Sequence, residues 1–149
     1  MIKRLEHTNL EVAKEIRAVF QASYKVEAAL LRAVDFPPLK RPIERFLHSR
    51  TQFFGYLKEG TLAGVAEIEL LPNTTSINSL VVHPDYFRQG IGKALMEYTL
   101  SHFTAPRFVV ETGVENGPAT TLYRKLGFTE VNQWDTDHGV RKVKFERVS

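Results

Sequence analysis

One short segment combines the residue types that could hold an anion. An apolar run at residues 80–82 is followed by a loop with glycines at positions 90 and 92 and cationic side chains at Arg88 and Lys93. Glycine lets a backbone approach a ligand closely, and the first amides of a helix carry partial positive charge. We therefore expect a phosphate group to bind at residues 88–93, where a buried strand passes through a loop into a helix.

The spacing of this segment departs from two common nucleotide-binding motifs. A dinucleotide-binding Gly-x-Gly-x-x-Gly would need a third glycine where Leu95 stands, and a P-loop would need Ser or Thr where Ala94 stands. A nucleotide-binding protein remains an alternative, and it predicts stronger stabilisation by ATP than by other phosphate ligands.

A second segment, residues 116–128, begins with Asn116 and carries Tyr123 on the apolar face of a short helix. Pro118 suits the first helical position and Gly127 suits the C-terminal cap, so a helix is expected over residues 118–126. Taken by itself, Tyr123 on such a face indicates a core aromatic residue.

Together the two segments resemble motifs A and B of the GNAT superfamily of acyl-CoA-dependent N-acyltransferases, and the resemblance covers residues 53–128. It implies that acetyl-CoA lies across the splayed ends of two strands, residues 75–82 and 107–112. It also implies that Tyr123 protonates the departing CoA thiolate and that the Val82 amide polarises the thioester carbonyl. The cofactor contacts implied by the resemblance involve Leu80, Val81, Val82, Arg88, Gln89, Gly90, Ile91, Gly92, Lys93, Asn116 and Tyr123. One position departs from the family pattern, because Phe87 stands where Gln or Arg is usual.

Transfer to an amine also needs a base, since a primary amine is protonated at neutral pH. Glu111 lies five residues before Asn116, a placement that resembles the base of some relatives that acetylate protein N-termini. Glu67 and Glu69 share one face of their strand, so Glu67 could meet the amine or belong to a solvated face. Both Glu111 and Glu67 stay candidates, and a site that uses neither is the third alternative.

Helical patterns precede and separate the two motifs. Thr8 and Glu11 have the spacing of a capping box, which predicts the start of an amphipathic helix. A second helix is expected over residues 26–34, before Pro37 and Pro38 stop it.

Strand patterns occupy much of the rest of the chain. Residues 53–58 and 62–70 read as one hairpin, and residues 128–134 and 140–148 read as another. The pattern indicates a mixed α/β chain of the α+β class. With the GNAT resemblance, we expect a mostly antiparallel sheet of six to seven strands, splayed at the middle strands and flanked by about four helices.

Length and composition narrow the functional classes. The 149 residues suit a single domain, residues 1–149, and the absence of cysteine excludes disulfides, thiolate nucleophiles and Cys-ligated metals. The five histidines show no metal-ligand spacing, so no metal is expected. No signal peptide or membrane-spanning run is visible, which favours a cytoplasmic location without membrane contact. The 20 basic and 17 acidic residues are spread along the chain, so nucleic acid is not an expected partner.

The GNAT resemblance implies an N-acetyltransferase that moves an acetyl group from acetyl-CoA to a primary amine, and the absence of cysteine favours direct attack in a ternary complex. The acceptor stays open among small amines, amino acids and protein amino groups, and a homodimer stays open as well. The alternative is an acyl-CoA-binding sensor or assembly module of the same fold without turnover. Several residues could serve the acceptor or merely form surface and core: Arg32, Lys40, Arg41, Arg45 and Arg50 among the basic ones, and Tyr24, Phe36 and Trp134 among the aromatic ones.

Overall fold

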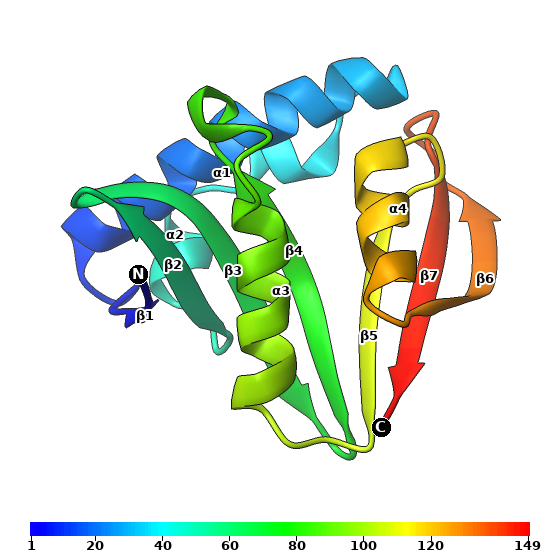
Figure 1. Ribbon diagram of the computed structural model, residues 1–149. Helices are drawn as coiled ribbons and strands as arrows, with labels where there is room; N and C mark the ends of the chain where they lie inside the picture. The colour runs from blue at the N-terminus through cyan, green and yellow to red at the C-terminus, as the bar shows by residue number, and fades with distance from the viewer.

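The computed structural model describes residues 1–149 and contains one seven-stranded sheet with four α-helices around it (Figure 1). The strands are β1 (Ile2–Leu5), β2 (Gln52–Lys58), β3 (Thr61–Leu71), β4 (Thr74–Val82), β5 (Arg107–Gly113), β6 (Thr129–Asp135) and β7 (Arg141–Val148). The helices are α1 (Leu10–Leu31), α2 (Glu44–Leu47), α3 (Ile91–His102) and α4 (Gly117–Lys125). This arrangement confirms the α+β class and the expected numbers of strands and helices.

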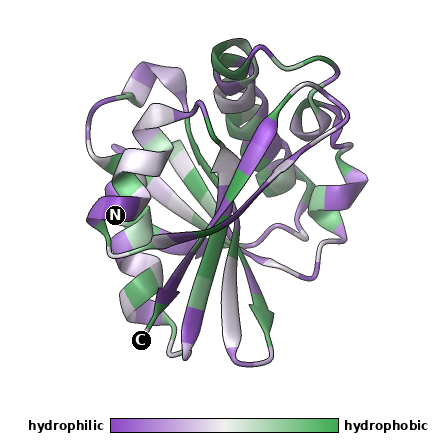
Figure 2. Cartoon of the chain, turned by 90° about the vertical axis from the view of Figure 1, so that its right-hand side faces the viewer, coloured by the Kyte–Doolittle hydropathy of each residue, from purple (hydrophilic) through white to green (hydrophobic).

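Alternate strand residues divide the core between the two faces of the sheet. Phe53 and Val65 pack in a cluster with α1 and α2, whereas their neighbours Phe54 and Ala66 pack in a cluster with α3 and α4. This follows from the period of two along a strand, which sends successive side chains to opposite faces. The turned view of Figure 2 shows the strands between helices on both sides, with hydrophobic and hydrophilic residues interspersed along them.

The sheet opens between its two middle strands. The strand order is β1-β2-β3-β4-β5-β7-β6, and β4 and β5 form its one parallel pair. Their pairing joins Thr74 to Arg107 at one end and stops at Ile77 and Val110, so the rest of both strands diverges. The divergence is visible as the widening gap between β4 and β5 in Figure 1. The splay expected from the family resemblance is therefore confirmed.

One continuous helix occupies the region where two were expected. α1 runs unbroken to Leu31, so the separate helix expected over residues 26–34 was wrong. Neither glycine nor proline lies between Ser23 and Leu31, and nothing interrupts the backbone hydrogen bonds there. The helix ends where Arg32 takes a left-handed conformation at φ 54°, and a short 3-10 helix, η1 (Pro37–Lys40), follows. Its unbroken length carries the second half of α1 to the splayed side of the sheet.

The start of α1 also differs from expectation in its cap. Asn9, not Thr8, is the N-cap, and its side chain accepts hydrogen bonds from the amides of Glu11 at 2.9 Å and Val12 at 3.3 Å. The capping box expected from Thr8 and Glu11 was therefore wrong by one residue. Asparagine is as strong an N-cap as serine, so the local sequence offered two competing starts.

Replacing Asn9 by alanine is expected to cost about 1 kcal/mol of unfolding free energy, because two amides of the first turn of α1 lose their acceptor. Urea denaturation followed by circular dichroism measures the difference. Thr8→Ala is the matched control and should change stability by less than about 0.5 kcal/mol. The reverse order of effects would restore Thr8 as the cap.

None of the helices combines the length and the apolar character needed to cross a membrane.

Candidate active site

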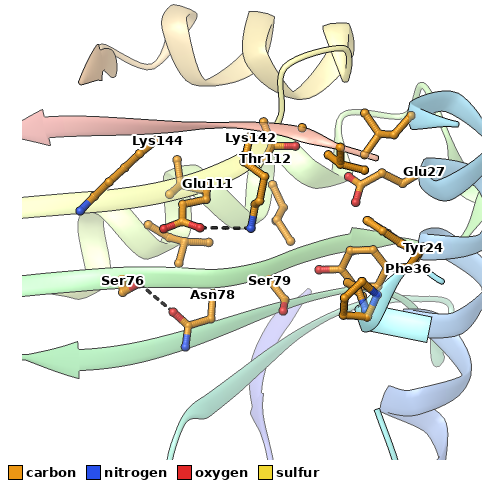
Figure 3. A pocket seen from close by; sticks show the side chains of 18 of the residues that line it. Tyr24, Glu27, Phe36, Ser76, Asn78, Ser79, Glu111, Thr112, Lys142 and Lys144 are labelled. Atoms are coloured by element: carbon orange, nitrogen blue, oxygen red, sulfur yellow. Dashed lines mark hydrogen bonds and ion pairs between the residues drawn. The ribbon is translucent and has the colours of Figure 1, made fainter. Parts of the chain in front are cut away.

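The splay between β4 and β5 opens into a cavity of about 600 Å³. Residues 76–80 of β4 and 109–113 of β5 line two of its sides, and side chains from β7 and α4 join them. One face of α1 covers it with residues spaced by three and four positions: Phe20, Tyr24, Glu27 and Leu31. Figure 3 shows hydroxyl and charged side chains from these elements directed into the same space.

Tyr123 lines this cavity from α4 and is only 4% exposed. Its ring packs against Phe128 and Phe145, with centroid separations of 6.0 and 5.8 Å. Burial, reinforced by the negative charge of Glu27 nearby, raises the pKa of the Tyr123 hydroxyl above its usual range. The phenol therefore holds its proton at neutral pH and can act as a donor.

Asn116 connects α4 to α1 and to β5. Its Oδ1 accepts from the Ala119 amide at 3.3 Å as the N-cap of α4, while its Nδ2 donates to Glu27 Oε1 at 2.6 Å and to Thr112 Oγ1 at 3.3 Å. The family resemblance implied a cofactor contact for this side chain. In the structure its amide groups are engaged within the protein, and they hold Glu27 beside the helix that carries Tyr123.

Glu27 is the acidic side chain that the sequence motifs did not identify. It is half-buried and lines the cavity. Burial raises the pKa of its carboxyl, while the hydrogen bond from Asn116 and the positive charge of Lys142 oppose that effect. A carboxylate with a raised pKa is a better proton acceptor than an ordinary one, so Glu27 is chemically suited to a reacting site.

Glu111, the first candidate base from the sequence, also lines the cavity, at the residue where β5 leaves its pairing with β4. Its Oε1 lies 3.1 Å from Lys142 Nζ, and its side chain is 44% exposed. Lys144 faces Glu111 across the β5–β7 pair and lines the same cavity. Glu111 therefore belongs to a solvent-facing ion pair at the β5 side of the cavity.

Glu67, the second candidate base, is not among the cavity-lining side chains. Its carboxylate accepts two hydrogen bonds from Arg41, at 2.7 and 3.0 Å, and others from Thr51 at 2.8 Å and Ser79 at 3.0 Å. The side chain is 4% exposed, and the ion pair with Arg41 neutralises its charge. Its oxygens are thus occupied by protein donors, and the structure gives Glu67 the surroundings of a buried structural carboxylate.

The edge of β4 that faces the gap presents main-chain groups at alternate residues. The His83 amide donates to Ala63 at 2.8 Å on the β3 side, so strand alternation turns the amides of Leu80 and Val82 toward the gap. The amide of Val81 turns toward β3 instead, which differs from the expected set of three contacts. The Val82 amide donates to Ser23 Oγ at 3.3 Å, and a ligand there would replace that hydroxyl.

The glycine loop leads directly into α3, as the sequence indicated. Arg88 and Gly90 take positive φ angles of 64° and 77°, and Gly90 is the N-cap of the helix. The amides of residues 91–93 therefore have no carbonyl partner within the helix. This is the local geometry that binds anions at a helix start.

The side chains of this loop have mixed environments. Ile91 is buried and anchors the helix to the core, while Arg88 and Lys93 are exposed. The Gln89 side chain accepts a hydrogen bond from Lys58 of β2. Phe87 is 42% exposed and does not belong to the core. The position that departs from the family pattern is therefore a surface residue.

The aromatic candidates separate into two groups. Tyr24 and Phe36 line the cavity, with ring centroids 5.9 Å apart, whereas Trp134 lies outside the lining and contacts Lys142. Burial and the charge of Glu27 raise the pKa of the Tyr24 hydroxyl above its usual range. Sequence periodicity could have placed Glu27 on the Phe20–Tyr24 face of α1, had that helix been expected to continue past Ser23.

Comparisons with known proteins point to one family. Residues 14–128 match the model of the Acetyltransferase (GNAT) family. The UPF0157 protein YqkA of Bacillus subtilis is 37% identical over 129 residues, which are 86% of this chain and 38% of YqkA. The ribosomal protein bS18-alanine N-acetyltransferase of Escherichia coli is 29% identical over 112 residues, 73% of this chain and 74% of that protein. The N-alpha-acetyltransferase RimI of Mycobacterium tuberculosis is 31% identical over 121 residues, 77% of this chain and 75% of that protein.

Solved structures with the same fold cover the whole chain. The crystal structure of the ribosomal-protein-S18-alanine N-acetyltransferase from Escherichia coli superposes with a TM-score of 0.78 at 23% identity, covering 99% of this chain and 92% of that one. The PaiA N-acetyltransferase from Thermoplasma acidophilum, solved in complex with coenzyme A, gives a TM-score of 0.73 at 20% identity, covering 100% and 99%. With its splayed seven-stranded sheet and its match over residues 14–128, the chain belongs to the GNAT acetyltransferase family.

Proposed function

We propose that the protein is an N-acetyltransferase that moves the acetyl group of acetyl-CoA to a primary amine. The observation that carries the proposal is the cavity between β4 and β5, because it joins the free edge of β4 to the buried hydroxyl of Tyr123. Such a site can pair an extended ligand with the strand edge and deliver a proton at the end of it.

The chain offers groups that suit each part of acetyl-CoA. The amides of residues 91–93 and the cation of Arg88 suit the pyrophosphate, and the outward amides of Leu80 and Val82 suit the pantetheine amides and the thioester oxygen. Tyr123 then stands as the proton donor for the thiolate that leaves. A carboxylate of the cavity takes the proton of the attacking amine.

The side chains of the cavity and the names of the relatives indicate which class of amine acceptor to test. Cationic side chains line the cavity of about 600 Å³ beside Glu27 and Glu111, and Lys142 is paired with Glu111. Glu27 is therefore the acidic group that could attract a cationic amine. Because one relative is named an alanine N-acetyltransferase and another an N-alpha-acetyltransferase, we infer that the α-amino group of a peptide is the acceptor to test first.

The test combines binding with turnover. A thermal-shift titration with acetyl-CoA, CoA and ATP is expected to show stabilisation by both CoA ligands and little by ATP. Release of the CoA thiol is then measured against an alanine-terminated peptide, lysine and a panel of small amines, and amine-dependent release is expected. Stabilisation without release would favour the acyl-CoA-binding module, and preferential stabilisation by ATP would favour a nucleotide-binding protein.

Gly92→Ala is expected to weaken acetyl-CoA binding about 10- to 100-fold without lowering the melting temperature. A Cβ at this position would meet only Leu122, Leu80 and Val82 side chains at 3.8–3.9 Å, so the fold itself does not require glycine. Alanine keeps the main-chain N–H, but its Cβ is expected to hold a phosphate away from the amides at the start of α3. A hydrogen bond to a charged phosphate contributes about 1.5–3 kcal/mol, which corresponds to that range of affinity.

Isothermal titration calorimetry measures the affinity of each variant for acetyl-CoA. Gly117→Ala is the matched control, because no atom lies within 4 Å of a Cβ there, and it should bind as the wild type does. Unchanged affinity in Gly92→Ala would place the pyrophosphate elsewhere than at the start of α3.

A further inference from the structure

We propose that Glu27 of α1 is the group that removes the proton from the acceptor amine. This inference rests on the proposed function and goes beyond the two sequence motifs, neither of which contains Glu27. It assigns a catalytic residue to the one long helix that crosses the splayed edge of the sheet.

The position of Glu27 fits this task. Its side chain lines the cavity, and Oε1 is held by Asn116 Nδ2 at 2.6 Å, while no protein donor binds Oε2. Figure 3 shows the carboxylate turned into the space between α1 and the β5 edge. A carboxylate with one oxygen fixed and the other free is oriented to accept a proton from a bound ammonium group.

Asn116 ties this carboxylate to the proton donor of the reaction. The same side chain caps α4, and Tyr123 lies on that helix, so the two proton-handling groups are positioned from one residue. Glu27 is also close enough to Tyr123 for its negative charge to help raise the pKa of the tyrosine hydroxyl. When Glu27 takes a proton its charge disappears, and Tyr123 becomes a stronger acid just as the thiolate forms.

The other carboxylates near the cavity suit this task less well. Both oxygens of Glu67 accept hydrogen bonds from protein donors, and its side chain does not line the cavity. Glu111 is 44% exposed and paired with Lys142 at 3.1 Å, so water and a cation compete for its oxygens.

The groups that surround Glu27 come from four elements. Tyr24 lies on its own helix, Tyr123 and the capping Asn116 belong to α4 and its start, and Thr112 of β5 binds the same amide as Glu27 does. Lys142 of β7 is the cation that opposes the effect of burial. Since burial prevails, the carboxylate should protonate at a higher pH than an exposed glutamate does.

The proton and bond changes balance without any further reactant. Glu27 takes one proton from the ammonium group, and the neutral nitrogen attacks the thioester carbon, forming the C–N bond. The C–S bond breaks with its electron pair on sulfur; Tyr123 gives its proton to that sulfur and regains one from the nitrogen. Glu27 then releases its proton to solvent, so each turnover yields an amide, CoA thiol and one proton.

The experiment compares Glu27→Gln with the wild type from pH 6 to pH 9, using the alanine-terminated peptide. If a panel amine reacts faster, it is used instead, and the pH range is moved up by the difference between its pKa and that of the peptide. A peptide α-amine has a pKa near 8, so about 1% is neutral at pH 6 and most is neutral at pH 9. Without its base the variant must use that neutral fraction. Its turnover is therefore expected to fall short of wild type by about 10²-fold at pH 6 and only a few-fold at pH 9.

Two matched variants and one spectroscopic measurement complete the test. Glu15→Gln removes an exposed carboxylate from the same helix and should leave turnover unchanged, and Glu111→Gln should not reproduce the pH-dependent ratio. The Asn116 side-chain amide resonance should titrate with Glu27, at a midpoint above the usual 4.5 of a glutamate. Because ionising a carboxyl of raised pKa costs folding free energy above that pKa, Glu27→Gln should remain folded at pH 7.

Different outcomes separate the two proposals. Suppose the wild type is active, but its turnover exceeds that of Glu27→Gln by the same factor at every pH, or the pH-dependent loss appears in Glu111→Gln instead. Either result would overturn the role of Glu27 and leave the proposed function standing. An Asn116 titration midpoint at or below 4.5 would also overturn it. A wild type that binds acetyl-CoA and acetylates no amine would overturn the proposed function and the role of Glu27 with it.

Discussion

Tyr123→Phe is expected to lower turnover about 10³-fold while leaving acetyl-CoA affinity within a few-fold of wild type. The substitution removes one oxygen from a residue that is 4% exposed, so water cannot easily take the place of the lost proton donor. The ring keeps its contacts with Phe128 and Phe145, and the fold should therefore be retained. Single-turnover measurement of thiol release, together with calorimetric titration of acetyl-CoA, separates the chemical step from binding.

Tyr98→Phe provides the matched control for this change. Tyr98 lies on α3 and packs against Phe54 and His102, away from the cavity, so its variant should turn over as wild type does. A Tyr123→Phe protein with full activity would show that the hydroxyl is not the proton donor. A wild type that also fails to release thiol would instead favour a protein that binds acyl-CoA without transferring the acyl group.

The parts of the site that could be predicted from the sequence are those built by local rules. The strand, glycine loop and start of α3 occupy one continuous stretch, and the φ of 77° at Gly90 is the conformation for which glycine is preferred. The same holds for α4, where Asn116 and Pro118 mark the start of the helix within one residue of the expected place. In both segments the structural signals and the candidate site residues lie in the same short stretch of sequence.

The parts that could not be predicted depend on contacts between distant residues. Glu27 becomes a site residue only because α1 continues to Leu31 and crosses the gap, which brings it to Asn116, 89 residues later in the chain. Its neighbours along the sequence carry no motif, and an isolated glutamate on a helix reads as a solvated residue.

The contact between Glu67 and Arg41 could not be predicted from the sequence either. Glu67 was a candidate base because strand periodicity cannot tell whether an inward carboxylate faces an open cavity or a partner. Arg41 was one of several basic residues that could have formed a solvated surface, yet it binds Glu67 from 26 residues away. Tertiary pairing, which periodicity does not encode, decides between a reactive carboxylate and a structural one.

Arg41→Met is expected to destabilise the protein by about 3–5 kcal/mol, because it leaves the Glu67 carboxylate buried without its cation. Arg41 makes two hydrogen bonds to Glu67, at 2.7 and 3.0 Å, and its guanidinium lies 4.2 Å from the Phe46 ring centroid. Methionine preserves much of the apolar stem that packs against Phe46. The loss of stability therefore reports the missing positive charge rather than missing packing. Urea denaturation at pH 7 measures the change, and Arg45→Met, an exposed neighbour, should shift stability by less than about 0.5 kcal/mol.

Adding Glu67→Gln to Arg41→Met should recover at least half of the lost stability, since the double variant buries no unpaired charge. Thr51 and Ser79 bind different oxygens of Glu67, and glutamine offers its oxygen to one hydroxyl and its NH2 group to the other. The recovery distinguishes a desolvated charge from a packing defect, because a cavity left by the arginine would persist in the double variant. Equal stability of the single and double variants would therefore show that Arg41 contributes through its contacts with the aromatic rings. A recovered double variant that also keeps its acetylation rate would place Glu67 among the residues that hold the sheet to η1, and leave proton transfer to the carboxylates that line the cavity.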